Sequence, residues 1–188
     1  MIQLDYKKAE TKILLPYAKK GNIKALEALL RNEQKHIYAL FAHLVKKRDD
    51  ISDLTQEVLL KIAKNIVQLK NDANFKAWVD KIITNTYYDY LKKHPDNFEE
   101  INDEKAKEIK EKTACEPGEK CIFWEIEEVI RSALFTLPRQ LRLALVLREY
   151  EGLSYSDISK IMQTTLGTVK SRISRARFRL QDRLKEFI

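Results

Sequence analysis

The sequence predicts an all-α protein: two small helical domains joined by a polar linker, the second containing a helix-turn-helix. Only four glycines and four prolines occur in 188 residues, and nearly every segment has apolar residues at helical spacing. Residues 152–180 add two short helical patterns separated by a turn. We expect four parts along the chain: an N-terminal tail with a first turn (1–21), a first domain (22–93), an acidic flexible linker (94–122) and a second domain (123–188).

Three long helices with short connections are expected in the first domain, which favours a compact bundle. Asn22 is a suitable N-cap for a helix that runs to about Lys47. Asp50 or Ser52 can begin the second helix, and a turn precedes the third, over residues 75–93. The expected inner faces are Leu26, Leu30, Ile37, Phe41 and Leu44, then Leu54, Val58, Ile62 and Ile66, then Phe75, Trp78, Val79, Ile82 and Thr86.

The second domain is expected to begin near Phe123 with a helix whose apolar pattern ends at Leu137. Pro138 then falls in the first turn of another helix, where a missing backbone N–H has no cost. Cys115 and Cys121 lie in the linker with no further cysteine and no nearby histidine, so we expect no metal site. They are either free thiols or a redox pair.

Residues 154–185 carry the pattern that is most informative about function. Ser154 can cap a short helix with Asp157 three residues later, and Thr165 can cap a second helix. The buried face of that second helix is expected to hold Val169, Ile173, Ala176, Leu180 and Leu184. The opposite side carries Lys170, Ser171, Ser174 and Arg175, with Arg172 and Arg179 beside them. Cations and small hydroxyls on the second helix are typical of a helix in the DNA major groove.

The charge distribution also points to a polyanionic partner. The net charge is +7, with +7 over residues 1–93, −4 over 94–122 and +4 over 123–188, so two basic blocks flank an acidic one. The first residues have no signal-peptide core and no apolar run approaches membrane-spanning length, so we expect a cytoplasmic protein without membrane insertion. No nucleophile–base set or phosphate-cradling glycine loop occurs, so we expect neither an enzyme nor a cofactor.

The three patterns together resemble a bacterial RNA polymerase sigma factor of the extracytoplasmic-function (ECF) group of the sigma-70 family. DISDLTQEVLLKI (50–62) is similar to the polymerase-binding segment of that family, and FKAWVDKIITNTYYDYLKK (75–93) to its promoter-melting and minus-ten helix. LPRQLRLALVLREYEGLSYSDISKIM with GTVKSRISRARFRL is similar to its minus-thirty-five domain. The resemblance covers about residues 20–93 and 123–186.

The resemblance implies roles for particular residues in the first domain. Asp53, Gln56 and Glu57 share a helix face by their spacing, and the family docks this face on the β′ clamp of core polymerase. Lys81, Asn85 and Lys92 form a polar stripe with Asp89, which is expected to meet the non-template strand, and Lys93 ends it. A loop that would cup a flipped base contains Lys70, Asn71, Asp72 and Asn74. Tyr87 and Tyr88 either stack on bases or close the core.

The resemblance further implies that the second domain reads the minus-thirty-five element. Its expected DNA-binding residues are Thr168, Lys170, Ser171, Arg172, Ser174, Arg175 and Arg179. The implied partners are promoter DNA, core RNA polymerase through its β′ clamp and β subunit, and an anti-sigma factor. One departure concerns the turn, because Gln163 occupies a position where the family usually has glycine.

Two other functions remain open from the sequence. A polymerase-independent helix-turn-helix regulator explains residues 123–188, but it leaves the acidic face and the polar stripe without a role. A thiol- or metal-responsive sensor would use Cys115 and Cys121.

Overall fold

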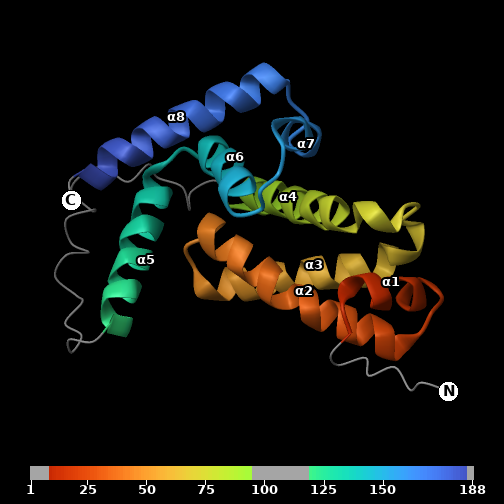
Figure 1. Ribbon diagram of the computed structural model, residues 1–188. Helices are drawn as coiled ribbons and strands as arrows, with labels where there is room; N and C mark the ends of the chain where they lie inside the picture. The colour runs from red at the N-terminus through yellow and green to blue at the C-terminus, as the bar shows by residue number, and fades with distance from the viewer. Residues whose placement is uncertain (1–8, 95–118, 186–188) are drawn as a thin grey trace. The chain divides into compact units, whose positions relative to one another are not determined.

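The computed structural model describes residues 9–94 and 119–185, with residues 119–126 described by their backbone alone. The chain divides into two compact units, Met1–Lys93 and His94–Ile188. All regular elements in the described ranges are helical, which confirms the all-α prediction (Figure 1). They are α1 (Thr11–Lys19), α2 (Ile23–Leu44), α3 (Arg48–Asn65), the 3₁₀ turns η1 (Ile66–Gln68) and η2 (Asp72–Asn74), α4 (Phe75–Lys93), α5 (Glu119–Thr136), α6 (Arg139–Glu149), α7 (Tyr155–Ile161) and α8 (Leu166–Leu184).

The N-terminal segment differs from the tail expected there, because Thr11–Lys19 forms the helix α1. Its side chains Leu14, Leu15 and Ala18 are buried, and the helix packs on α2. Gly21 ends the helix with φ +85°, and the amides of Gly21 and Asn22 donate to the carbonyls of α1's last turn. The buried apolar side chains explain why the segment folds: they remove its inner face from water.

The core of the first unit lies between α2, α3 and α4, with α3 contacting both of the others (Figure 1). Asn22 caps α2 by accepting a hydrogen bond from the Ala25 amide at 3.0 Å, as expected. The helix α3 begins at Arg48, earlier than predicted. Ser52 therefore lies inside the helix, where its hydroxyl donates back to the Arg48 carbonyl at 3.3 Å and does not act as a cap. The fully buried side chains include Leu29, Ile37, Phe41, Leu44, Val58, Ile62, Val79 and Ile83.

Two tyrosines of α4 fix its position against the rest of the first unit. Tyr87 is fully buried and its hydroxyl lies 3.4 Å from the Leu44 carbonyl, so it belongs to the core. Tyr90 donates to Asp50 at 2.6 Å across to the start of α3. Four expected core positions, Leu26, Leu30, Trp78 and Ile82, are only partly buried. Leu29 and Ile83, the sequence neighbours of Leu30 and Ile82, are fully buried instead. A one-residue error of this kind rotates a helical face by about 100°.

The second unit has α5 and α6 leading into the helix-turn-helix α7–α8. The helix α5 begins at Glu119, inside the expected linker, whose residues 95–118 lie outside the described ranges. Arg142 of α6 lies over the Phe135 ring of α5, 4.6 Å from its centroid, which joins these two helices. The helix α8 packs on α5, α6 and α7 through Val169, Ile173 and Ala176. The expected inner face of α8 is therefore correct at its centre.

The turn of the helix-turn-helix is built from two capped helices. Ser154 accepts from the Asp157 amide at 3.1 Å while its hydroxyl donates to the Asp157 carboxylate at 2.6 Å. Thr165 accepts from the Thr168 amide at 3.1 Å, so both expected caps are confirmed. Gln163 has φ +50°, a left-handed conformation that favours glycine. Among the described helices, none is both long and apolar enough to cross a membrane.

Candidate nucleic-acid and protein interfaces

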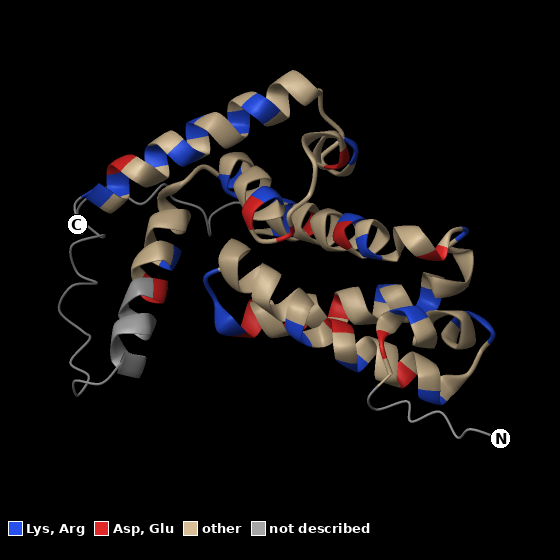
Figure 2. Cartoon of the chain, viewed as in Figure 1, with Lys and Arg blue, Asp and Glu red and all other residues tan. Residues whose placement is uncertain are grey.

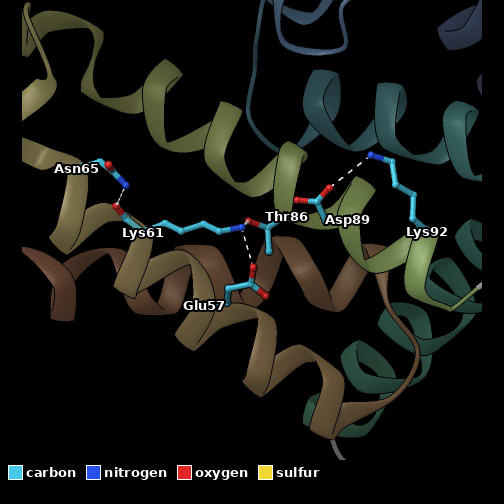
Figure 3. Close-up of polar contacts among 6 residues, drawn as sticks. All are labelled: Glu57, Lys61, Asn65, Thr86, Asp89 and Lys92. Atoms are coloured by element: carbon cyan, nitrogen blue, oxygen red, sulfur yellow. Dashed lines mark hydrogen bonds and ion pairs between the residues drawn. The ribbon is translucent and has the colours of Figure 1, made fainter.

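The three residues of the acidic face of α3 differ in their exposure and in their contacts within the protein. Asp53 and Gln56 are exposed, whereas Glu57 is partly covered and pairs with Lys61 at 2.7 Å. The Lys61 ammonium also donates to the Thr86 hydroxyl of α4 at 2.9 Å, so Glu57 lies at the seam of two helices (Figure 3). Because Lys61 already compensates its charge, Glu57 is a weaker candidate for a partner's cation than Asp53.

The same face of α3 contains an apolar residue that the sequence analysis passed over. Leu60 is 59% exposed, and it follows Gln56 by four residues and Asp53 by seven, so the three share one side of the helix. That side is opposite the buried Val58 and Ile62. The sequence signal was a leucine that follows two polar residues of the expected surface by four and seven positions. An apolar centre with a polar rim is the usual composition of a protein-binding surface.

The polar stripe of α4 lies on the side opposite its buried face. Lys81, Asn85, Asp89 and Lys92 are all exposed, as is Lys93 at the end of the helix. Lys92 pairs with Asp89 at 3.5 Å, so part of its charge is compensated within the stripe (Figure 3). Asn85 offers both a donor and an acceptor for a base edge.

The loop between η1 and α4 places four expected residues at the surface. Lys70, Asn71, Asp72 and Asn74 are all exposed. Asn71 accepts from the Ala73 amide at 3.0 Å and so caps the turn η2. Asp72 is paired with Lys19 of α1 at 2.6 Å, a contact that the sequence analysis did not foresee.

The exposed face of α8 combines hydroxyls and cations in a bonded arrangement. Ser171 donates to the Thr168 carbonyl at 3.0 Å, and Arg175 donates to the Ser171 carbonyl and hydroxyl at 3.2 and 3.3 Å. Lys170, Ser174 and Arg179 are exposed, whereas Arg172 and Thr168 are partly covered. The Thr168 hydroxyl lies 2.8 Å from that of Thr165, within the cap. Figure 2 shows basic residues along α8 beyond its first turn, with one acidic position near its C-terminal end.

Two other arginines connect the helices of the second unit. Arg177 pairs with Glu149 of α6 at 2.6 Å. The hydrogen bond and charge of Glu149 raise the pKa of the Arg177 guanidinium above its usual value. Arg148 donates to the Leu153 carbonyl at 2.7 Å and lies over the Tyr155 ring, which ties α6 to the start of α7. These contacts add to the apolar packing of Val169, Ile173 and Ala176, which fixes the position of α8.

An aromatic residue on the outer face of α8 was also missed by the sequence analysis. Phe178 is 71% exposed, and it follows Ser174 by four residues and Arg175 by three. It therefore shares the face opposite Val169 and Ile173. An exposed ring at this place can contact a thymine methyl group. The signal in the sequence was an apolar residue outside the buried stripe.

The two cysteines of the expected linker lie outside the residues whose side chains are described. Cys115 lies outside them, and Cys121 belongs to the part of α5 that is described by its backbone alone. The expectation of free thiols, with a redox pair as the alternative, stays a prediction.

Comparisons with known proteins agree with this arrangement of two units. The family model described as "Sigma-70 region 2" matches residues 29–95, and "Sigma-70, region 4" matches residues 127–180. The chain is 32% identical over 179 residues to the ECF RNA polymerase sigma-E factor of Haemophilus influenzae, covering 92% of this chain and 94% of that one. It is 30% identical over 184 residues to the sigma-E factor of Escherichia coli K12, covering 94% and 95%.

A solved structure is similar over nearly the same span. The sigma factor RpoE of Bartonella quintana, in complex with the anti-sigma factor NepR, superposes with a TM-score of 0.65 at 27% identity, covering 87% of this chain and 98% of that one. Matches to both sigma-70 regions, in this order and at these identities, settle the family and the class of activity, which is transcription initiation. The family is one of transcription regulators and not a family of catalytic enzymes. The chain belongs to the ECF group of RNA polymerase sigma factors, which bind core polymerase and promoter DNA.

Proposed function

We propose that this sigma factor divides its work among three surfaces: the α3 face for polymerase, the α4 stripe with the preceding loop for the minus-ten element, and the outer face of α8 for the minus-thirty-five element. The observation that carries the proposal is that all three lie opposite the buried face of their helix. A partner can therefore bind each surface while the core stays intact.

The polymerase surface centres on Asp53, Gln56 and Leu60. Burial of the exposed Leu60 side chain against a partner would contribute favourable free energy of binding. The two polar residues beside it would set the orientation of the partner. Glu57 contributes less, because its ion pair with Lys61 must be broken before it can meet a new cation. We assign the clamp of the β′ subunit as the partner of this surface.

The two DNA surfaces are expected to act together. Each is small, so each unit alone would bind DNA weakly. Polymerase holds both units at once, and the second contact then forms at a high effective concentration. In this scheme Asn85 and the loop before α4 contact the opened minus-ten strand, while Lys170, Ser171 and Arg175 read duplex DNA in the major groove.

We also propose an anti-sigma partner and a signal-responsive role for this chain. The support is the Bartonella quintana relative, which was solved with an anti-sigma factor. The protein would act in the cytoplasm, where polymerase and DNA are, and it would carry out no catalysis itself.

The test of the polymerase surface is a pull-down of core polymerase with purified full-length variants. Asp53→Lys combined with Leu60→Asp should reduce the recovery of polymerase roughly tenfold or more. Asp53→Lys reverses a charge at the contact, and Leu60→Asp places a carboxylate where an apolar side chain would be buried. Glu27→Lys is the matched control: Glu27 is an exposed acid on α2 whose partner, Arg31, is also exposed. Both proteins should keep the wild-type helical circular dichroism signal.

The outcome separates this function from the alternative. Undiminished recovery of the folded double variant would show that α3 has been misassigned. Failure of the wild-type chain to recover polymerase, together with transcriptional effects from binding DNA alone, would favour a polymerase-independent regulator.

A further inference from the structure

The loop over residues 70–74 has few contacts of its own. Its exposed residues include all four expected base-contacting side chains, and inside the loop Asn71 caps η2 through the Ala73 amide. A pocket for a flipped base must keep its shape to within a fraction of an ångström if it is to discriminate bases. The loop therefore needs support from a rigid element.

That support comes from α1, a helix far away in the sequence. The Lys19 ammonium lies 2.6 Å from the Asp72 carboxylate, across 53 positions of the chain. The helix α1 also lies against both η1 and η2. The Lys19 side chain is only 22% exposed, so its stem packs on the protein while its charged end reaches the loop.

Lys19 has a fixed position at the end of α1, so it can hold Asp72 in place. It is the last residue of α1, which is held by the buried Leu14 and Ala18 and is followed directly by the turn at Gly21. Its position is therefore set by packing and not by the loop. The ion pair has a second effect, because an uncompensated carboxylate at Asp72 would repel the phosphates of an approaching strand.

We propose that Lys19 is a positioning residue for minus-ten recognition: it holds Asp72, and Asp72 serves as the anchor of the loop and not as a reader of bases. The inference rests on the proposed role of this loop in reading the minus-ten element. It brings α1 into the promoter-reading apparatus and changes the role expected for Asp72 from the sequence.

The test uses holoenzyme and a library of promoters randomised in the minus-ten element. Lys19→Met and Asp72→Asn should each lower discrimination at the flipped base about two- to fivefold, which is the range expected for one exposed ion pair. The double variant should be no worse than either single variant, because both remove the same interaction. Lys19→Arg should retain most of the discrimination. Lys20→Met, which changes the exposed neighbour of Lys19, should match the wild type.

Base discrimination, and not stability alone, is the deciding readout. A purely structural role would lower the melting temperature of Lys19→Met without changing base preference, which would overturn the proposal. A strong effect of Asp72→Asn beside a neutral Lys19→Met would show that Asp72 reads DNA directly. Asn74→Ala serves as the test of the loop itself. If Asn74→Ala changes base preference but Lys19→Met does not, only the positioning inference fails; if neither changes it, the loop is not the reader and both proposals fail.

Discussion

The two proposed DNA surfaces contain similar residues, but their basic side chains differ in the partners that they contact. On the α4 side, Lys92 pairs with Asp89 and Lys19 pairs with Asp72, so cations are compensated close to where DNA is expected. On α8, Arg175 bonds to neutral oxygens of Ser171. Residues 165–185 carry seven cations against one acid, and two of these cations are paired, Arg177 with Glu149 and Lys185 with Asp182. We infer that α8 attracts duplex phosphates electrostatically, whereas the α4 surface depends on hydrogen bonds to bases once the strands separate.

The largest expected effect comes from removing Arg175. Arg175→Ala should weaken promoter use by about 1–3 kcal/mol and relax preference at particular base pairs, because a guanidinium can bond a guanine edge with two donors. Arg179→Ala is a control on the same helix and should give a smaller loss of promoter use that does not depend on the DNA sequence. The slope of log affinity against log salt concentration should become shallower by about one, because one phosphate contact is removed. The measurement is transcription from randomised minus-thirty-five elements at two salt concentrations. Unchanged base preference in Lys170→Ala, Ser171→Ala and Arg175→Ala alike would contradict the comparison.

A smaller effect, of a different kind, is expected from Asn85. Asn85→Ala removes a side chain that can bond base edges, at a cost of about 1 kcal/mol, or roughly fivefold in open complex. The loss should be nearly independent of salt, since no charge is removed. Permanganate reactivity of thymines near the start site measures the opening. A premelted bubble should partly restore a melting defect, and unaltered opening of duplex promoters would mean that the stripe has another role.

The smallest expected effect comes from substitutions in one turn of each unit. Gly21 and Gln163 both have left-handed backbones, with φ +85° and +50°, but only the first is a glycine. Gln163→Gly should stabilise the second unit by about 0.5–1 kcal/mol, because the relief of backbone strain exceeds the added entropy of the unfolded glycine. Gly21→Ala should destabilise the first unit by about 1 kcal/mol. The space around Gly21 is open, so this loss would come from the backbone and not from a clash.

Hydrogen exchange measured by mass spectrometry can follow the two units separately in the full chain. Protection should rise in α7 and α8 for Gln163→Gly and fall in α1 and α2 for Gly21→Ala. A destabilised Gln163→Gly protein would show that the glutamine side chain has a role that outweighs its backbone strain.

The sequence by itself determined the features that depend on neighbours along the chain. Asn22, Ser154 and Thr165 cap helices as expected, because a cap joins residues only three apart. Val169, Ile173 and Ala176 are buried as expected, because helical spacing alone puts them on one face. The exposure of Asp53, Asn85 and Arg175 followed from the same spacing. The nine-residue helix α1 was missed, since Pro16 and its short length obscured the pattern of Leu14, Leu15 and Ala18.

Only the tertiary structure decided which faces meet. The contacts of Lys19 with Asp72, Lys61 with Thr86 and Arg177 with Glu149 join residues 53, 25 and 28 positions apart. Helical periodicity shows that a side chain points outward, but it does not show which element lies opposite. Packing of the apolar faces sets that choice, because it fixes the rotation and height of each helix, and the long cations then find their partners. For this reason the role of Glu57 and the anchoring of Asp72 could not be obtained from the sequence.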